Sequence, residues 1–198
     1  MTQEQWPMFA WAAAVALAIV AGAWTAINRP QIQVSLPVEH VAGAALLGLF
    51  GWESLVNLPG VVMGYWTLTA GLGDVRGVEG DQAYVVAQAA FVVAAAFAVT
   101  GILRRRAWGA VLGIGLAASI VVRIGLVLFE TTALYAESMD GGTYFGVVSA
   151  LVGMQAIPAL AIIALLGWPM MRRRTHPVGA ADRDWSTPAA PGTEYPSS

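Results

Sequence analysis

Five long stretches of apolar, almost uncharged residues constrain the fold of this chain more than any other feature. A helix needs about 20 such residues to cross the hydrocarbon core of a membrane. The stretches are Met8–Ile27, Val41–Leu72, Ala83–Leu103, Ala107–Phe129 and Thr143–Met171. The sequence therefore predicts an all-α fold, a multi-pass bundle of five transmembrane helices.

The composition separates this chain from soluble proteins. Only 11% of its residues are charged and 58% are hydrophobic, whereas soluble domains carry about 25% charged residues. This difference excludes a soluble enzyme, a nucleic-acid-binding protein and a disordered adaptor. The chain contains no Cys and no Lys, so it lacks thiolate ligands for metal clusters and the amine that a Schiff base requires. With only two histidines besides, we expect no cofactor and no metal site.

The arginines predict how the helices are oriented. Residues 104–106 and 172–174 are arginine triplets that close the third and fifth stretches, and the positive-inside rule places both in the cytoplasm. Eight arginines then lie inside, and Arg76 alone lies outside. Arginine without lysine, beside abundant Ala, Val and Gly, is typical of a GC-rich bacterial genome. We therefore predict a protein of the bacterial cytoplasmic (inner) membrane with an external N-terminus and a cytoplasmic C-terminus.

The sequence divides into two parts. Residues 1–174 contain all five apolar stretches and form the predicted bundle. Residues 175–198 are rich in Pro, Ala, Ser and Thr and cannot bury enough apolar surface to fold. We interpret them as a disordered cytoplasmic tail.

The second stretch allows an alternative topology. Val41–Leu72 is long for a single span and contains the Pro59–Gly60 pair. Two half-helices broken at this pair would form a re-entrant hairpin, which a membrane protein tolerates where other helices bury the backbone. Four spans plus this hairpin would then place the N-terminus inside.

Polar residues inside the predicted spans are the strongest functional candidates, because ionisable groups are costly in a membrane. At a rise of about 1.5 Å per residue, Glu53 lies about 18 Å from the inner end of its span, and Asn57 and Arg123 lie about 24 Å from it. Glu53 and Asn57 also share a helix face. We predict one intramembrane polar cluster of Glu53, Asn57, Arg123 and Gln155, with Gln88 as a further neighbour.

Two interpretations of this cluster remain open. In the first, Glu53 and Arg123 form a buried ion pair that clamps the helices together, and removing either partner leaves an uncompensated charge. In the second, Glu53 is the centre of a proton or ion pathway, because a carboxylate at membrane depth can exchange protons if water reaches it.

Small residues recur at four-residue spacing and indicate where helices approach closely. The predicted helix-packing residues are Gly60, Gly64, Gly109, Gly113 and Ala117. Packing within the bundle is the simpler interpretation. The alternative is that the ridge from Gly109 to Ala117 faces outward and receives a partner.

Tryptophans occur near the predicted span ends, as is typical of residues in the headgroup region. Trp6, Trp11, Trp108 and Trp168 follow this pattern. We predict an interfacial position for all four.

One short string resembles a catalytic motif. Residues 71–76 read Gly-Leu-Gly-Asp-Val-Arg, which resembles the GxGD signature of intramembrane aspartyl proteases and of prepilin peptidases. That resemblance implies a catalytic role for Asp74. Such enzymes need a second aspartate that shares a proton with the first, and the predicted spans contain none. A glycine-rich turn at a helix end explains the same residues.

The sequence contains no other constellation that supports catalysis, so we expect a non-enzymatic membrane protein. The leading hypothesis is an accessory or assembly subunit of a larger membrane complex, a respiratory-chain complex for example. Its partners would be other membrane subunits, or further copies of itself, within the lipid bilayer. The alternatives are a small ion, proton or solute transporter built around Glu53 and an aspartyl peptidase at Asp74.

Overall fold

A computed structural model describes residues 6–29, 37–71, 78–135 and 141–175, and these residues form five helices without any strand. The helices are α1 (Trp6–Asn28), α2 (Val38–Gly71), α3 (Val78–Leu103), α4 (Ala107–Tyr135) and α5 (Gly141–Thr175). Each contains a segment long and apolar enough to cross a membrane. The predicted all-α bundle of five spans is therefore confirmed. Except for Thr175, the predicted tail lies outside the described residues.

The second helix is continuous, so the re-entrant hairpin is wrong. α2 runs from Val38 to Gly71 and passes through Pro59 without a break. A proline removes one backbone hydrogen bond, and the remaining bonds of a long apolar helix outweigh that loss in a membrane. At about 1.5 Å per residue, α2 is about 50 Å long and exceeds the hydrocarbon thickness.

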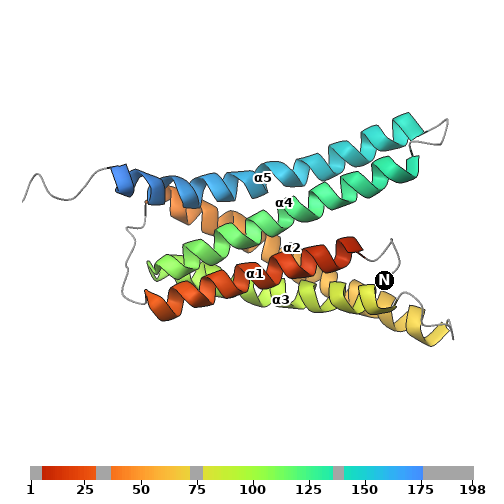
Figure 1. The fold of residues 1–198 in the computed structure, drawn as a ribbon, viewed down its shortest axis with the longest axis horizontal. Helices are drawn as coiled ribbons and strands as arrows, with labels where there is room; N and C mark the ends of the chain where they lie inside the picture. The colour runs from red at the N-terminus through yellow and green to blue at the C-terminus, as the bar shows by residue number, and fades with distance from the viewer. Residues whose placement is uncertain (1–5, 30–36, 72–77, 136–140, 176–198) are drawn as a thin grey trace, which may run out of the picture.

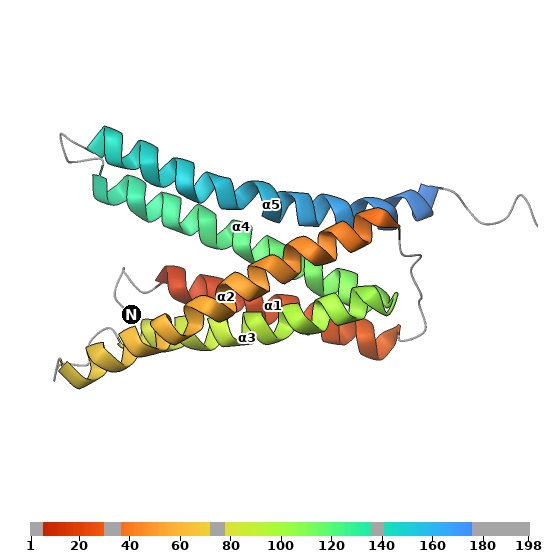
Figure 2. The same ribbon diagram turned by 180° about the vertical axis from the view of Figure 1, so that it is seen from behind.

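Successive helices run in opposite directions (Figures 1 and 2). The α3–α4 turn and the last residues of α5 lie at one end of the molecule, together with the end of α1 and the start of α2. The opposite end holds the start of α1, the end of α2 and the start of α5. Both arginine triplets therefore belong to the same end, as the predicted orientation requires.

Helix α4 lies at the centre of the packing arrangement. It contacts α1, α3 and α5 extensively, while α2 packs mainly against α3 and α5. α2 crosses the back of the bundle diagonally, close to α5 at its start and close to α3 farther along (Figure 2). At the end of the molecule where α4 ends and α5 begins, these two helices diverge from α1, α2 and α3 (Figure 1). We call this end the diverging end. This divergence creates the space for the site described below.

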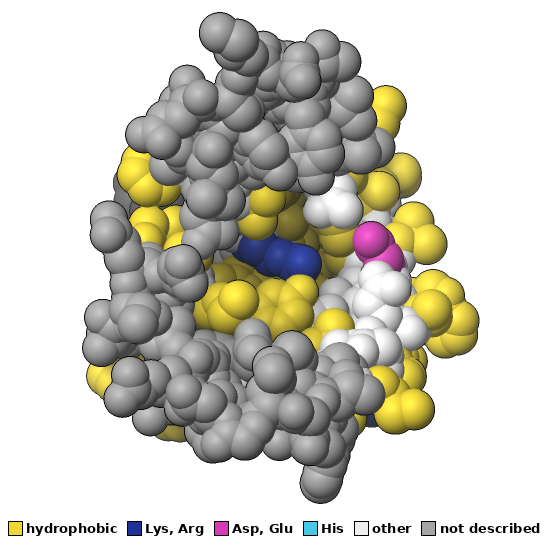
Figure 3. Space-filling view, turned by 90° about the vertical axis from the view of Figure 1, so that its right-hand side faces the viewer, with side chains coloured by type: hydrophobic (Ala, Val, Ile, Leu, Met, Phe, Trp, Pro, Cys, Tyr) yellow, Lys and Arg dark blue, Asp and Glu magenta, His cyan; other side chains and the backbone are white. Residues whose placement is uncertain are grey.

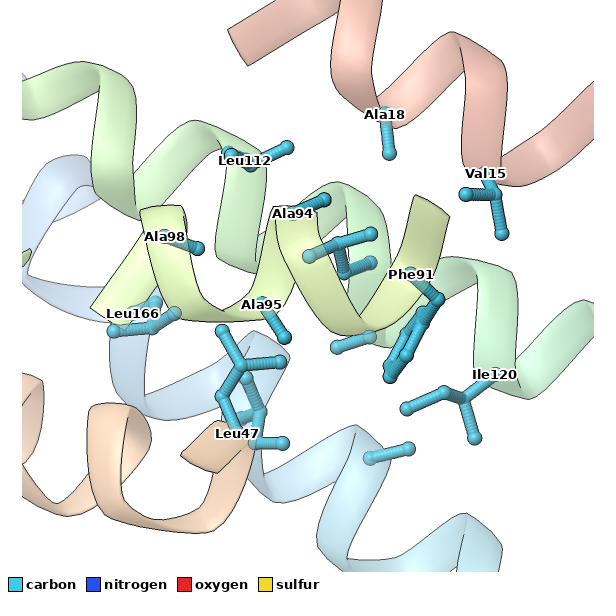
Figure 4. Packing of buried hydrophobic residues seen from close by; sticks show 14 of the residues in the cluster. Val15, Ala18, Leu47, Phe91, Ala94, Ala95, Ala98, Leu112, Ile120 and Leu166 are labelled. Carbon is cyan, nitrogen blue, oxygen red and sulfur yellow. The ribbon is translucent and has the colours of Figure 1, made fainter. Parts of the chain in front are cut away.

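The core is built from small residues of α3 and α4 and from larger side chains that fill the spaces between helices. Ala95 and Ala98 of α3 are fully buried and lie near Leu47 of α2 and Leu166 of α5 (Figure 4). Such alanines allow helices to approach closely, and this close packing stabilises bundles in lipid. Toward the diverging end, Phe91, Ile120 and Ile124 of the core also line the cavity described below.

The small-residue ridge of α4 faces into the bundle. A Cβ at Gly109 would lie 2.5 Å from the backbone of α3, and one at Gly113 would lie 2.9 Å from Leu166. Ala117 is fully buried. The interpretation that this ridge faces outward is therefore wrong, because α3 and α5 already cover it.

The predicted packing residues of α2 give a different result. Gly60 is exposed, and a Cβ there would meet no atom within 4 Å. The surroundings of Gly64 lie outside the described part of the structure. Close approaches that we did not single out occur instead at Gly43, which faces Leu166, and at Gly115, which faces Ala18.

The turn between α3 and α4 is short and tightly closed. Arg106 N donates to Gly101 O at 2.9 Å, and Arg105 N donates to Ile102 O at 2.8 Å. This pair of bonds is the Schellman motif, which requires a left-handed residue after the helix. Arg105 occupies that position with φ of 59°. The turn allows Gly109 to contact Gly101 almost immediately after the chain reverses.

Candidate functional site

A cavity of about 230 Å³ lies where the helices diverge. We call it the polar cavity, because polar side chains from all of α1 to α5 line it. They are Trp11, Glu53, Ser54, Asn57, Tyr84, Gln88, Arg123 and Gln155. Figure 3, which looks at this end of the molecule, shows a hollow with a basic side chain inside it and an acidic side chain at its edge. The structure thus brings Glu53, Asn57, Arg123 and Gln155, the four residues of the predicted cluster, to one place.

Arg123 is held against α1 and α3 by two aromatic residues. Its Nη2 donates a hydrogen bond of 2.8 Å to the hydroxyl of Tyr84. Its guanidinium carbon lies 5.1 Å from the ring centroid of Trp11 and 5.4 Å from that of Tyr84. Both distances fall within the range of cation–π attraction. The two rings also contact each other, with centroids 5.1 Å apart, so they form a fixed platform for the cation.

The expected Glu53–Arg123 ion pair is absent from the described residues. Glu53 is exposed and forms neither an ion pair nor a hydrogen bond within that part of the chain. The reason is geometric, since Tyr84 and Trp11 direct the guanidinium toward α3 and α1, whereas Glu53 stands on α2. The clamp hypothesis, in the form of a direct pair between these two residues, is therefore wrong.

Gln88 forms the α3 wall of the polar cavity. It is only 3% exposed, and its Nε2 donates a hydrogen bond of 3.3 Å to the backbone oxygen of Ser54. Its Oε1 is buried without a hydrogen-bond partner among the described residues. A buried acceptor without a partner costs about 1–3 kcal/mol. A buried acceptor of this kind calls for a partner such as a water molecule, an ion or a ligand.

The polar cavity opens between α2 and α5. Glu53 and Asn57 on α2 and Gln155 on α5 line the cavity and are also exposed. Its inner wall is apolar, because Phe91 and Ile120 belong to the buried core. The site is therefore accessible from one end and from one side.

Three polar residues of the site, Trp11, Ser54 and Tyr84, were missed by the sequence analysis. Trp11 is 3% exposed and packs against the core, so neighbouring helices surround its ring, while its interfacial depth stays a prediction. The sequence does contain a signal, because Trp11 lies farther inside its span than Trp6 does. Tyr84 is half-buried near the start of α3, and nothing in its local sequence distinguishes it from an interfacial tyrosine.

The residues of the catalytic resemblance are not among the described residues of this site. Asp74 lies in 72–77, outside the described residues. Within the described residues, no group of three or more acidic, histidine or cysteine side chains is arranged to hold a metal ion. The described polar side chains of the cavity can form hydrogen bonds and recognise charge.

Comparisons of the chain with protein-family models, with curated proteins and with solved structures find no match.

Proposed function

We propose that this chain is a non-enzymatic membrane protein that binds a small ion or polar solute in the polar cavity, as part of a transport pathway. One observation carries the proposal: Arg123 lies within a spanning helix, lines a cavity and has no acidic partner among the described residues. Arginine at membrane depth is expensive, and it is usually found facing a cavity or a substrate path.

The contacts of Arg123 support a binding role over a purely structural one. A structural arginine would be expected to pair with a carboxylate, because an uncompensated buried charge costs several kcal/mol. Here the aromatic platform orients the guanidinium, and no carboxylate of the described residues pairs with it. Glu53, which stands across the same cavity, is also without a partner in the described chain. Two opposite charges kept apart in one cavity are suited to binding a ligand between them.

The apolar core blocks the passage of a solute beyond the polar cavity. Phe91 and Ile120 close the inner side of the polar cavity, and the buried residues beyond them form a dry layer. A solute that enters from the diverging end therefore stops at the cavity. Passage across the membrane would need α4 and α5 to move relative to α2 and α3.

Thermal unfolding of the purified protein in detergent tests the proposal. Sodium, potassium, chloride, acetate, ammonium and small neutral and zwitterionic solutes are added one at a time. A ligand that binds the folded state stabilises it by about 2.7 kcal/mol at 100 times its Kd. We expect at least one of these additions to stabilise the protein and Arg123→Gln or Glu53→Gln to abolish the effect.

Two matched variants serve as controls. Glu39→Gln changes an exposed acid at the other end of the same helix, and Arg104→Gln changes an exposed arginine at the α3–α4 turn. Both should retain the stabilisation. A ligand that stabilises the wild type and all four variants equally would contradict the proposal, as would the absence of any stabilising ligand. Uptake of the stabilising ligand into liposomes then tests transport.

A second candidate function is an accessory or assembly subunit of a larger membrane complex. The exposed polar edge formed by Glu53, Asn57 and Gln155 favours it. Polar side chains exposed to lipid are unfavourable, and a partner helix that hydrogen-bonds them would remove this cost. Mass spectrometry of the natively solubilised protein tests this role. A subunit should be recovered with other membrane proteins in a fixed ratio, and Asn57→Leu should weaken that association.

The proposed location is the bacterial cytoplasmic membrane, with the C-terminus in the cytoplasm. The bias of eight arginines to one supports it. Reporter fusions after Arg106 and after Arg174 test it. Both should report a cytoplasmic position, and an external position for either would contradict the orientation.

A further inference from the structure

We infer that the ligand of the polar cavity is a small zwitterion, a molecule that carries both an anionic oxygen group and a protonated amine. The inference rests on the proposed function, and it names the chemical class of the ligand. It follows from the charges of the cavity, from the groups around each charge and from the size of the space.

The described charges of the lining favour a ligand that carries both charges. Among the described residues that line the polar cavity, Arg123 and Glu53 are the only charged ones, and their charges are opposite. A lone anion or a lone cation would pair with one of them and leave the other without a partner, which is unfavourable. A zwitterion presents one charge to each residue.

Arg123 is suited to bind the anionic group of the ligand. A guanidinium has five N–H donors in a planar fork that matches carboxylate and phosphate oxygens. One of these donors is used by the Tyr84 hydroxyl. Contact with the Trp11 and Tyr84 rings fixes the plane of the group, so little freedom is lost when a ligand binds.

Glu53 and its neighbours are suited to the cationic end. Glu53 has no partner within the described residues, and its carboxylate accepts hydrogen bonds from an ammonium group. Asn57 follows one helical turn later on the same face, and Gln155 lines the cavity from α5. Each amide supplies a carbonyl oxygen as a further acceptor. An ammonium group has three donors, which these three side chains can satisfy.

Gln88 is an independent indication of a polar ligand. Its side chain is 97% buried in the cavity wall, and its Oε1 accepts no hydrogen bond from the described residues. Trp11 Nε1, a donor in the same lining, is also buried without a partner among the described residues, so the wall favours a ligand with donors and acceptors over an apolar one.

The volume limits the size of the ligand. A cavity of about 230 Å³ corresponds to the space of about seven or eight water molecules at ~30 Å³ each. This is less than the volume of a typical site for a drug-sized ligand. A free amino acid or a lipid headgroup such as phosphoethanolamine has the required charges. A free solute would enter from the diverging end, and a headgroup would enter between α2 and α5.

Binding measurements with defined probes test the inference. Alanine, taurine and the phosphodiester glycerophosphoethanolamine are the zwitterionic probes, and acetate and methylammonium carry one charge each. Thermal unfolding in detergent is followed at equal concentrations of each probe. We expect at least one zwitterionic probe to raise the Tm, with acetate and methylammonium ineffective. Arg123→Gln and Glu53→Gln should each weaken its binding by about tenfold or more, equivalent to about 1.4 kcal/mol, whereas Arg104→Gln and Glu39→Gln should not.

Lipid nanodiscs distinguish the two sources of the zwitterion. If the headgroup is the ligand, phosphatidylethanolamine nanodiscs should raise the Tm above that in phosphatidylglycerol nanodiscs, and Glu53→Gln should remove the difference. If a free solute is the ligand, glycerophosphoethanolamine, alanine or taurine should act equally in both lipids. Either result supports the inference.

The failure of this inference differs from the failure of the proposed function. Stabilisation by acetate or methylammonium alone, lost in Arg123→Gln or Glu53→Gln, would overturn the zwitterion and leave the binding function standing. No response to any probe or lipid, in the wild type as in the variants, would overturn both.

Discussion

The guanidinium of Arg123 lies over the indole ring of Trp11, 5.1 Å from the ring centroid, and so joins α4 to α1 at membrane depth. Trp11 is 3% exposed, so the contact is largely shielded from solvent. Cation–π contacts are worth about 2 kcal/mol when they are desolvated. The position of the cation in the cavity therefore depends on a residue of the first helix.

Replacing Trp11 should weaken the bundle and displace Arg123. Trp11→Leu keeps an apolar side chain and removes the aromatic face, so we expect a loss of about 2 kcal/mol in the free energy of unfolding. Trp24→Leu is the matched control, because Trp24 is 69% exposed on the same helix. It should change stability by less than about 0.5 kcal/mol. Unfolding of both variants in mixed detergent micelles provides the measurement, and equal losses would contradict the assignment.

The hydroxyl of Tyr84 is the second support for Arg123. Tyr84→Phe keeps the ring contact and removes the hydrogen bond of 2.8 Å. Hydrogen bonds between transmembrane helices average about 0.6 kcal/mol and reach about 1.7. We expect a loss within that range, measured by the same unfolding assay. In the Arg123→Gln background the additional loss should be smaller, and an unchanged loss there would show that the hydroxyl acts elsewhere.

Glu53 and Arg123 should be only weakly coupled in the absence of ligand. No ion pair joins them in the described structure, so the double variant Glu53→Gln/Arg123→Gln should lose nearly the sum of the two single changes. Residues that share a cavity without a direct contact can still be coupled, and we expect a coupling of about 0.5–1 kcal/mol. A double-mutant cycle of unfolding free energies measures the coupling. Recovery of stability in the double variant would restore the clamp hypothesis.

The spans could be predicted from the sequence because apolar length is a local property. Each of the five stretches contains its own signal, and the depth of a residue follows from the helical rise. Depth alone placed Glu53, Asn57, Arg123 and Gln155 at similar heights, and all four line the polar cavity.

The partner of Arg123 could not be predicted in the same way. Which side chain Arg123 meets depends on the rotation of α4 about its axis, and contacts between distant segments set that rotation. The close approach of Gly115 to Ala18 is one such contact. Similarly, the spacing of Gly60 and Gly64 identifies a helix face but not whether another helix covers it.

The two glycines Gly109 and Gly60 should respond oppositely to the same substitution. A Cβ at Gly109 would lie 2.5 Å from backbone atoms of Gly101 and Ile102, and backbone cannot yield as a flexible side chain does. Gly109→Ala should therefore separate α3 from α4 and cost about 2 kcal/mol or more. Gly60→Ala meets open space, so it should be neutral or slightly stabilising. Detergent unfolding of the two variants checks the contrast, and similar losses at both positions would contradict the packing at the α3–α4 turn.

Arg105 occupies a position in which glycine would be more stable. Its φ of 59° is left-handed, and this conformation costs a side-chain-bearing residue about 1–2 kcal/mol. The hydrogen bonds of Arg105 and Arg106 to the end of α3 fix this geometry. Arg105→Gly should therefore raise the free energy of unfolding by about 1 kcal/mol. Arg104→Gly removes the same charge from the neighbouring residue, which is not left-handed, and should give no gain. A gain in both variants would indicate that charge repulsion within the triplet, and not backbone conformation, limits stability at this turn.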